Sequence, residues 1–202
     1  YSIFLYGLLT FNWAITSDFL QTKRYLKRKL SFGKFPKPSA QWGTLILSKL
    51  IYFSIWLVVP ILFFDIAWYK ILIGFFIMHY IAGVILSIVF QLAHVIEAAD
   101  MPLPEPSGTM KNTWAIHQLF TTVNFSTKNR IMNWFTGGLN HQVEHHIFPN
   151  ISHVHYTKIS KIVRETALEF NLPYNEYKTT RKAIIAHFRH LKHMGQQPAL
   201  HA

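Results

Sequence analysis

Two long apolar runs constrain the fold of this chain more than any other feature. The first covers residues 43–64, where Lys49 is the only charged residue, and the second covers residues 71–92. A run of about 20 apolar residues is the length that a helix needs to cross the hydrocarbon core of a bilayer. The turn between them contains Trp68 and Tyr69, an aromatic pair typical of a bilayer interface. The sequence therefore predicts a transmembrane helical hairpin.

The distribution of positive charge predicts how this hairpin is oriented. The net charge is +11, and residues 21–42 carry seven cations and no acid. Because cytoplasmic loops are enriched in Lys and Arg, we expect residues 21–42 to form a basic cytoplasmic loop and the chain after the hairpin to be cytoplasmic. The charge is separated from the apolar runs, which argues against nucleic-acid binding and favours anionic headgroups and acidic partners. An ordinary solvated loop is the alternative for this segment.

The first 20 residues are apolar and aromatic, but Asn12, Thr16 and Ser17 interrupt them. Such a segment fits an interfacial helix, a core helix or the end of a membrane span, and the sequence alone does not separate these. The chain begins at Tyr1 without a basic leader or a small-residue cleavage site. We therefore expect Tyr1 to be the cut edge of a longer protein.

The densest cluster of metal-binding residue types is GGLNHQVEHHIFP, residues 137–149. The chain has no cysteine and 12 histidines, which excludes disulfides and cysteine-ligated metal sites. If the stretch is helical, Gln142, His145 and His146 lie within an arc of about 100°. Glu144 then points the other way. A helix face that gathers neutral nitrogen and oxygen donors predicts a metal site. Packing in a core is a poor alternative, because adjacent imidazoles gain little from burial and each needs a hydrogen-bond partner. A solvated polar helix is the remaining alternative.

Other histidines extend this prediction. His94 lies in QLAHVIE at the cytoplasmic end of the second apolar run, with Glu97 three residues later, where it could accept the second ring N–H. His141 and His145 are four residues apart and could bind a metal by themselves. His79 lies in mid-span, where an ionisable side chain is costly, so we expect a hydrogen bond between helices or a place in a ligand cavity.

The remainder, residues 93–202, is predicted to be a cytoplasmic helical region. The segment 114–130 is polar and aromatic and forms either a cavity wall or surface. Apolar residues recur at three- and four-residue spacing over about 155–170, which predicts an amphipathic helix that ends before Leu172-Pro173. A basic helix follows over about 176–194, and its histidines are predicted to lie on a solvated face: His187, His190 and His193. The predicted fold class is all-α, an integral membrane hairpin with a cytoplasmic helical cap that carries the metal ligands.

The stretch GGLNHQVEHHIFP, followed by SHVHY and preceded by QLAHVIE, resembles the membrane fatty acid desaturase family. The likeness is greatest to front-end and related bacterial acyl desaturases, whose third histidine box reads Gln-x-x-His-His, here residues 142–146. It covers essentially the whole chain but only the C-terminal part of the family's usual length. Two earlier boxes, His-x-x-x-His and His-x-x-His-His, are not in this sequence. We therefore expect residues 1–202 to be the C-terminal part of a single desaturase domain, inactive alone.

The resemblance implies a di-iron centre held almost entirely by imidazoles. The matching positions for catalytic and metal-binding residues are His94, His145 and His146, with Gln142 as a further metal ligand. Gln142 stands where many relatives have histidine, so it ligates weakly, holds a water or orients the site. Positions expected to support the site without ligating are His141, Glu97 and His153.

The resemblance also implies the chemistry and the partners. Two iron ions, dioxygen as co-substrate and electrons from ferredoxin or cytochrome b5 would introduce a cis double bond into a fatty acyl chain. The chain would be presented at the bilayer as acyl-CoA, acyl-ACP or acyl-lipid. Two alternatives stay open: another histidine-box di-iron membrane enzyme, such as a fatty acid or sterol hydroxylase or an alkane monooxygenase, and a non-catalytic metal-binding membrane protein.

Overall fold

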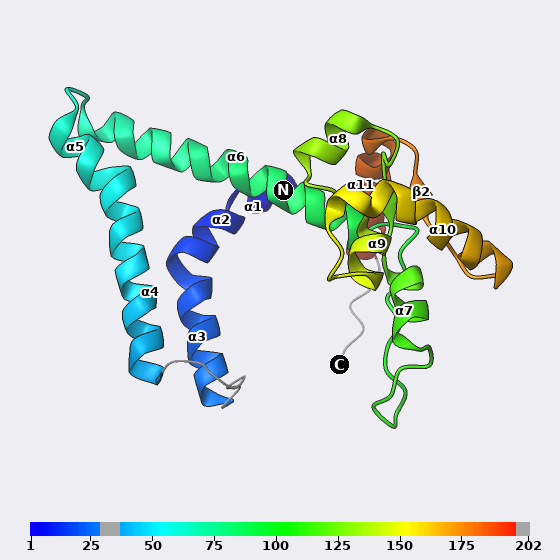
Figure 1. The fold of residues 1–202 in the computed structure, drawn as a ribbon. Helices are drawn as coiled ribbons and strands as arrows, with labels where there is room; N and C mark the ends of the chain where they lie inside the picture. The colour runs from blue at the N-terminus through cyan, green and yellow to red at the C-terminus, as the bar shows by residue number, and fades with distance from the viewer. Residues whose placement is uncertain (29–36, 197–202) are drawn as a thin grey trace. The chain divides into compact units, whose positions relative to one another are not determined.

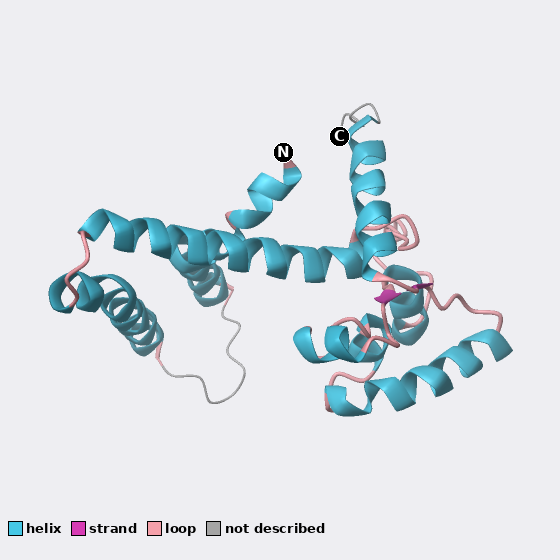
Figure 2. Ribbon diagram, turned by 90° about the horizontal axis from the view of Figure 1, so that it is seen from above, coloured by secondary structure: helices cyan, strands magenta, loops and turns pink. Residues whose placement is uncertain are grey.

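A computed structural model describes residues 1–28 and 37–196 of the chain, and Figures 1 and 2 show it to be dominated by helices. The chain divides into two compact units, an N-terminal unit, Tyr1–Ser87, and a C-terminal unit, Ile88–Ala202. The prediction of a helical protein is confirmed. The part of the chain that the structure describes also contains a pair of two-residue strands in the C-terminal unit, magenta in Figure 2.

Within residues 1–28 and 37–196, three helical segments are long and apolar enough to cross a membrane, and they begin in the N-terminal unit. The first, Ser2–Lys27, consists of α1 (Ser2–Gly7), α2 (Leu9–Asn12), the π-helix η1 (Trp13–Ser17) and α3 (Asp18–Lys27). The second, Pro38–Phe63, consists of α4 (Pro38–Phe53), the π-helix η2 (Ser54–Val58) and α5 (Val59–Phe63). The third is α6 (Trp68–His94).

The predicted hairpin is present, but the predicted basic loop at 21–42 is too long. Residues 21–27 continue α3, and residues 38–42 already belong to α4. Lys and Arg are good helix formers, and Pro is favoured at the first helical position, where it stands at Pro38. The part of the predicted loop at 29–36 lies outside the described residues.

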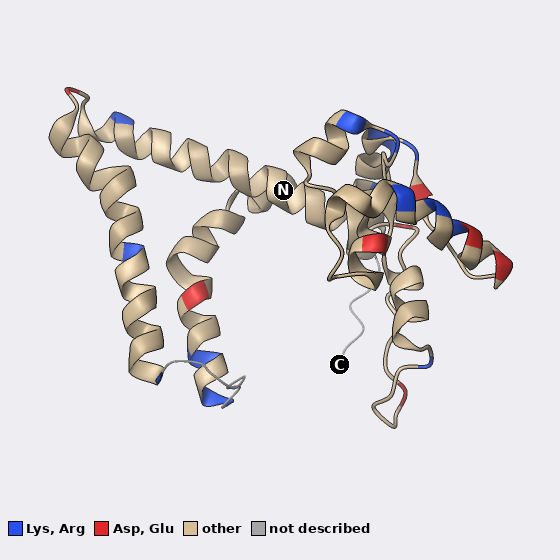
Figure 3. Ribbon diagram, viewed as in Figure 1, with Lys and Arg blue, Asp and Glu red and all other residues tan. Residues whose placement is uncertain are grey.

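The surface of the N-terminal unit matches a lipid environment. No residue in the most apolar stretch of Pro38–Phe63 is buried. Leu47, Leu50 and Leu62 are 58%, 61% and 70% exposed. Figure 3 shows few charged residues along α4 and α6. Exposed apolar area costs about 25 cal/mol per Å² in water and nothing comparable in hydrocarbon, so this unit belongs to a membrane protein.

His79 joins the three long helices by hydrogen bonds. The Thr10 hydroxyl donates to the His79 carbonyl at 2.7 Å and lies 2.9 Å from His79 Nδ1. Since that hydroxyl has a single proton, it accepts from Nδ1–H, and His79 Nε2 accepts from the Tyr52 hydroxyl at 2.7 Å. The ring is therefore neutral with both nitrogens satisfied, which confirms the predicted hydrogen bond between helices.

Gly7 and Gly83 allow the first and third helices to approach closely. A Cβ added at Gly83 would lie 2.6 Å from the Gly7 carbonyl oxygen and 2.8 Å from that of Tyr6. Small residues at such contacts let helix backbones pack in a membrane, where apolar side chains gain nothing by leaving lipid. The close approach therefore depends on glycine at position 83.

We expect Gly83→Ala to destabilise the protein in detergent by about 1–3 kcal/mol, because the backbones must separate. The matched control is Gly74→Ala on the same helix, where a Cβ meets nothing within 4 Å. The control gains about 1 kcal/mol of helix propensity at most. Thermal unfolding followed by circular dichroism measures both, and equal melting temperatures for the two variants would contradict this packing.

The C-terminal unit is built from short elements after α6. They are α7 (Trp114–Thr121), β1 (Asn124–Phe125), α8 (Arg130–Phe135), α9 (Gln142–Ile147), the 3-10 helix η3 (His153–His155), α10 (Tyr156–Glu169), β2 (Glu176–Tyr177) and α11 (Thr180–Gln196). The two strands are parallel, with Asn124 opposite Glu176. The helix predicted over 155–170 is confirmed as α10. The last helix begins at Thr180 instead of about 176, because residues 176–177 pair with β1.

The prediction that the α11 histidines form a solvated face is wrong for His187. His187 is fully buried, and its Nδ1 lies 2.5 Å from the Val95 carbonyl oxygen. Burial lowers the pKa of His187, since the charged ring would lose its hydration. It lies on the helix face of Ala183 and Ala186, two residues of the core cluster that also contains Leu92.

Candidate metal centre

The backbone before α9 depends on two glycines. Gly137 and Gly138 have φ of 59° and 79°, a region that favours glycine. A Cβ at Gly138 would also lie 2.7 Å from the Cβ of His153. The turn leads into α9, which ends two residues before Pro149. The Gly-Gly start and the Pro stop expected from the sequence therefore enclose one short helix.

Three of the predicted site histidines come together in the C-terminal unit. The ring centroids of His94 and His146 are 4.9 Å apart, and those of His145 and His146 are 5.6 Å apart. His94 is the last residue of α6, whereas the other two lie on α9. All three side chains are half-buried. Residues about 50 positions apart in the sequence thus form one cluster of imidazoles.

Hydrogen bonds orient two of these rings. His94 Nδ1 lies 3.5 Å from the carbonyl oxygen of Thr121. Since a carbonyl only accepts, His94 Nδ1 carries the proton and Nε2 keeps its lone pair. His145 Nδ1 lies 3.3 Å from the hydroxyl of Tyr156, which is buried. Such partners on one ring nitrogen are typical of metal-binding histidines, because they fix the ring orientation and leave the other nitrogen free to ligate.

His146 is neutral at physiological pH. Burial, and after it repulsion from His94 and His145 when those rings are protonated, together lower its pKa to about 4. A neutral imidazole keeps a lone pair for a metal, whereas a protonated one does not. The environment of His146 thus favours the form that binds metals.

The remaining predicted residues occupy different surroundings. Gln142 is buried at the start of α9, and His153 is exposed in η3. Glu97 does not accept from His94 as expected, because α6 ends at His94 and the i+3 geometry is lost. Glu97 Oε2 lies instead 3.7 Å from Arg189 Nη1, and the Thr121 carbonyl takes the place expected for Glu97.

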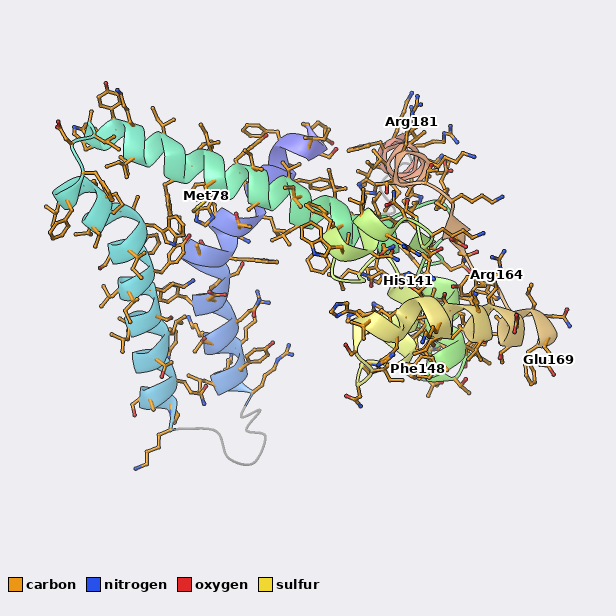
Figure 4. The ribbon with its side chains drawn as sticks, turned by 45° about the horizontal axis from the view of Figure 1, so that its top comes forward. Met78, His141, Phe148, Arg164, Glu169 and Arg181 are labelled. Carbon is orange, nitrogen blue, oxygen red and sulfur yellow. The ribbon has the colours of Figure 1, made fainter. Side chains whose placement is uncertain are left out.

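His141 is the most deeply buried of the expected supporting residues, at 1% exposure. Neither of its ring nitrogens has a hydrogen-bond partner among the residues that the structure describes. Its Nδ1 lies 3.7 Å from Glu144 Oε2, and it lines a cavity of about 220 Å³ with Gly138 and His153. Figure 4 labels His141 beside the start of α9. Its carbonyl oxygen accepts from the backbone N–H of His145 at 3.0 Å.

The donor set of this cluster fits part of a metal centre. Neutral imidazoles suit iron, zinc and copper, and the oriented rings leave nitrogens free. Over residues 1–28 and 37–196, however, no group of three or more histidine, aspartate or glutamate side chains could hold an ion. The imidazoles therefore fit as one wall of a site that needs further ligands.

Several residues around the cluster were not identified from the sequence. Residues 122–127 are all buried, although four of the six have side chains that hydrogen-bond. The prediction that segment 114–130 is a cavity wall or surface is confirmed for Ala115, Ile116 and Leu119, which line a cavity of about 260 Å³, and residues 122–126 instead lie in the interior of the C-terminal unit. The density of Thr, Asn and Ser in this run is the sequence signal that could have identified them, because polar side chains that become buried need hydrogen-bond partners. Tyr174 and Tyr156 had no local signal.

Apolar helices long enough to span a bilayer, followed by a cluster of imidazoles at the end of one of them, define a membrane protein with a candidate metal centre. The chain belongs to the fatty acid desaturase family: the family model described as "Fatty acid desaturase" matches residues 1–178. The resemblance expected from the histidine box is thereby confirmed.

Curated relatives agree with this family. The chain is 42% identical over 128 residues to the sn-1 linoleoyl-lipid 6-desaturase of Synechocystis, a match that covers 63% of this chain and 36% of the relative. It is 35% identical over 196 residues to the enzyme of that name from Arthrospira platensis, covering 96% and 52%. It is also 35% identical over 196 residues to the acyl-lipid (8-3)-desaturase of Physcomitrium patens, covering 96% and 40%. The chain thus spans about half the length of these relatives or less. No solved structure matches it.

We expect Tyr156→Phe to weaken metal binding by about 10- to 100-fold, because it removes the hydroxyl beside His145 Nδ1 while keeping the ring. Anaerobic titration of the full-length protein with Fe²⁺ measures the affinity. The control is Tyr69→Phe, which changes an exposed tyrosine at the start of α6. An unchanged affinity in Tyr156→Phe would show that this hydroxyl does not orient the ligand.

Proposed function

We propose that this chain takes part in the oxygen-dependent introduction of a cis double bond into a fatty acyl chain, at a di-iron centre. The observation that carries the proposal is the convergence of His94 with His145 and His146, at ring distances of 4.9 and 5.6 Å between neighbours, in a member of the fatty acid desaturase family. Rings brought together from α6 and α9, with free nitrogens, are suited to bind a metal shared by the two elements.

The residues that would hold iron are His94, His145, His146 and Gln142. The iron pair supplies the activation of dioxygen when bound. The chain's own residues keep the rings neutral and oriented, through burial of His146 and through the Thr121 and Tyr156 partners of the other two rings. The chain has no cysteine, so these 202 residues contribute no thiolate that strong oxidants would destroy.

The substrate class that fits best is a fatty acyl chain carried by a membrane lipid. An alkyl C–H bond offers no polar handle, so selectivity must come from placing one methylene beside the reactive centre. The relatives are named as desaturases of linoleoyl-lipid and acyl-lipid, which supports an acyl-lipid over acyl-CoA or acyl-ACP. The apolar, lipid-matched surface of the N-terminal unit supports delivery from the bilayer.

The catalytic face is proposed to be cytoplasmic. Lys and Arg are preferred in cytoplasmic loops. The cations that follow α3 in the sequence and the overall charge of +11 therefore support this orientation. The same charge would attract an acidic electron-donor protein, such as ferredoxin or cytochrome b5.

Single substitutions test the site. In the full-length protein, His145→Ala and His146→Ala are each expected to abolish the unsaturated product, and His94→Ala to nearly abolish it, because each removes an imidazole ligand. His190→Ala on α11 is the matched control and should change product little. Gas chromatography of lipids from an expressing host measures the outcome, and normal desaturation by His145→Ala would overturn the assignment.

Metal analysis tests the function independently of the product. Anaerobically purified full-length protein is expected to contain iron, measured by elemental analysis. Near-zero iron with zinc in its place would contradict the desaturase proposal and favour a non-catalytic metal-binding protein. A hydroxylated acyl chain in place of an unsaturated one would assign the protein to the hydroxylases of the same histidine-box type.

A further inference from the structure

A fully buried carboxylate lies on the side of α9 opposite the imidazole cluster. Glu144 has 0% of its surface exposed. Its Oε2 accepts a hydrogen bond from Asn124 Nδ2 at 2.8 Å, and its Oε1 accepts one from the Tyr174 hydroxyl at 2.9 Å. Asn124 Nδ2 also donates to the Tyr174 oxygen at 2.9 Å. A buried carboxylate is costly even when it is hydrogen-bonded, so this cluster is a poor way to gain stability alone.

Asn124 also holds the first turn of α9. Its Oδ1 accepts from the backbone N–H of Val143 at 2.9 Å. The first N–H groups of a helix lack partners within the helix, and the N-cap residue His141 provides no side-chain cap here. The side-chain oxygen of Asn124 therefore caps α9 from another segment, while the side-chain nitrogen of the same residue donates to Glu144.

The segment that carries Asn124 is also attached to the end of α6. The Val123 N–H donates to the Ala93 carbonyl oxygen at 3.0 Å, and the Thr121 carbonyl accepts from His94 Nδ1 at 3.5 Å. Residues 121–124 thus touch both elements that carry the histidines. Any movement of this segment changes His94 and α9 together.

A six-residue helix does not hold its own orientation. α9 is far shorter than the roughly 12–15 residues at which isolated helices become marginally stable, so its neighbours must fix it. Because side chains follow each other at 100° around a helix, rotation of Glu144 out of its pocket would carry His145 and His146 away from His94.

We propose that the Asn124–Glu144–Tyr174 cluster is a positioning device that sets the rotation of α9 and so aims His145 and His146 at His94. Asn124 and Glu144 are positioning residues that act through the imidazoles. The proposal rests on the proposed function, in which these imidazoles bind iron.

Reversal of the amide and the carboxylate gives a direct test. Glu144→Gln sets an amide N–H against either the Asn124 N–H or the Tyr174 hydroxyl proton, so one hydrogen bond is lost in either orientation, and Asn124→Asp sets two carboxylates against each other. The double variant Asn124→Asp/Glu144→Gln restores a donor and an acceptor in reversed order and keeps the acceptor for Val143 N–H. It loses the bond from position 124 to the Tyr174 oxygen and the carboxylate beside His141 Nδ1. The matched control is Thr180→Val, which removes a hydroxyl pair between Ser126 and Thr180 without touching α9.

Two measurements on the full-length protein report the result. In anaerobic Fe²⁺ titrations, each single variant is expected to lose about 10- to 100-fold in affinity, and the double variant should recover most of that loss. In hydrogen exchange of the metal-free protein, amides of residues 142–147 should exchange faster in each single variant and return towards the parent rate in the double variant. Thr180→Val should leave both measurements at the parent value.

Unchanged exchange over 142–147 in the single variants, or a double variant whose loss of affinity equals the two single losses combined, would overturn the proposal. If the single variants fail to fold, the double variant decides: iron affinity within tenfold of the parent supports the proposal, and weaker binding overturns it. A parent protein that binds no iron would defeat the proposed function instead, and the exchange data would still report on the cluster.

Discussion

The hydrogen bonds of Asn124 are the interaction on which the C-terminal unit most depends. One carboxamide caps α9, binds the buried carboxylate of Glu144 and lies in the strand that pairs with β2. Two helices of this unit, α8 and α9, have six residues each, and helices of that length are not stable alone. Hydrogen bonds between elements therefore fix the position of the imidazole cluster. They require polar side chains in the interior of this unit.

The N-terminal unit is held together by a different balance of forces. Its surface is apolar, so in a bilayer there is no hydrophobic gain from bringing its helices together. Close packing at Gly7 and Gly83 and the bonds of His79 to Thr10 and Tyr52 supply the specific contacts. The buried polar groups of the two units thus have the same task, which is to select one arrangement where apolar packing alone would allow several.

Much of the fold followed from periodicity and composition, while the boundaries did not. The apolar runs predicted the hairpin, and the three- and four-residue spacing predicted α10. The loop at 21–42 was predicted too long because charge was taken as a sign of a loop, although Lys and Arg extend a helix readily. His187 was assigned to a solvated face because its neighbours in the sequence are basic, whereas its helix face is set by Ala183 and Ala186. The charge of sequence neighbours does not show which face of a helix is buried against the rest of the unit.

The sequence by itself determined the family, the helical hairpin of the second and third apolar segments and the choice of His94, His145 and His146 as candidate ligands, because apolar length and the histidine box are local patterns. Only the tertiary structure decided that Thr121 and not Glu97 faces His94, that the His141 ring is buried without a hydrogen-bond partner among the described residues, and that Asn124 and Tyr174 hold Glu144. The physical reason is that these contacts join residues 20 to 50 positions apart, whose approach depends on how the elements pack and leaves no periodic trace in the chain.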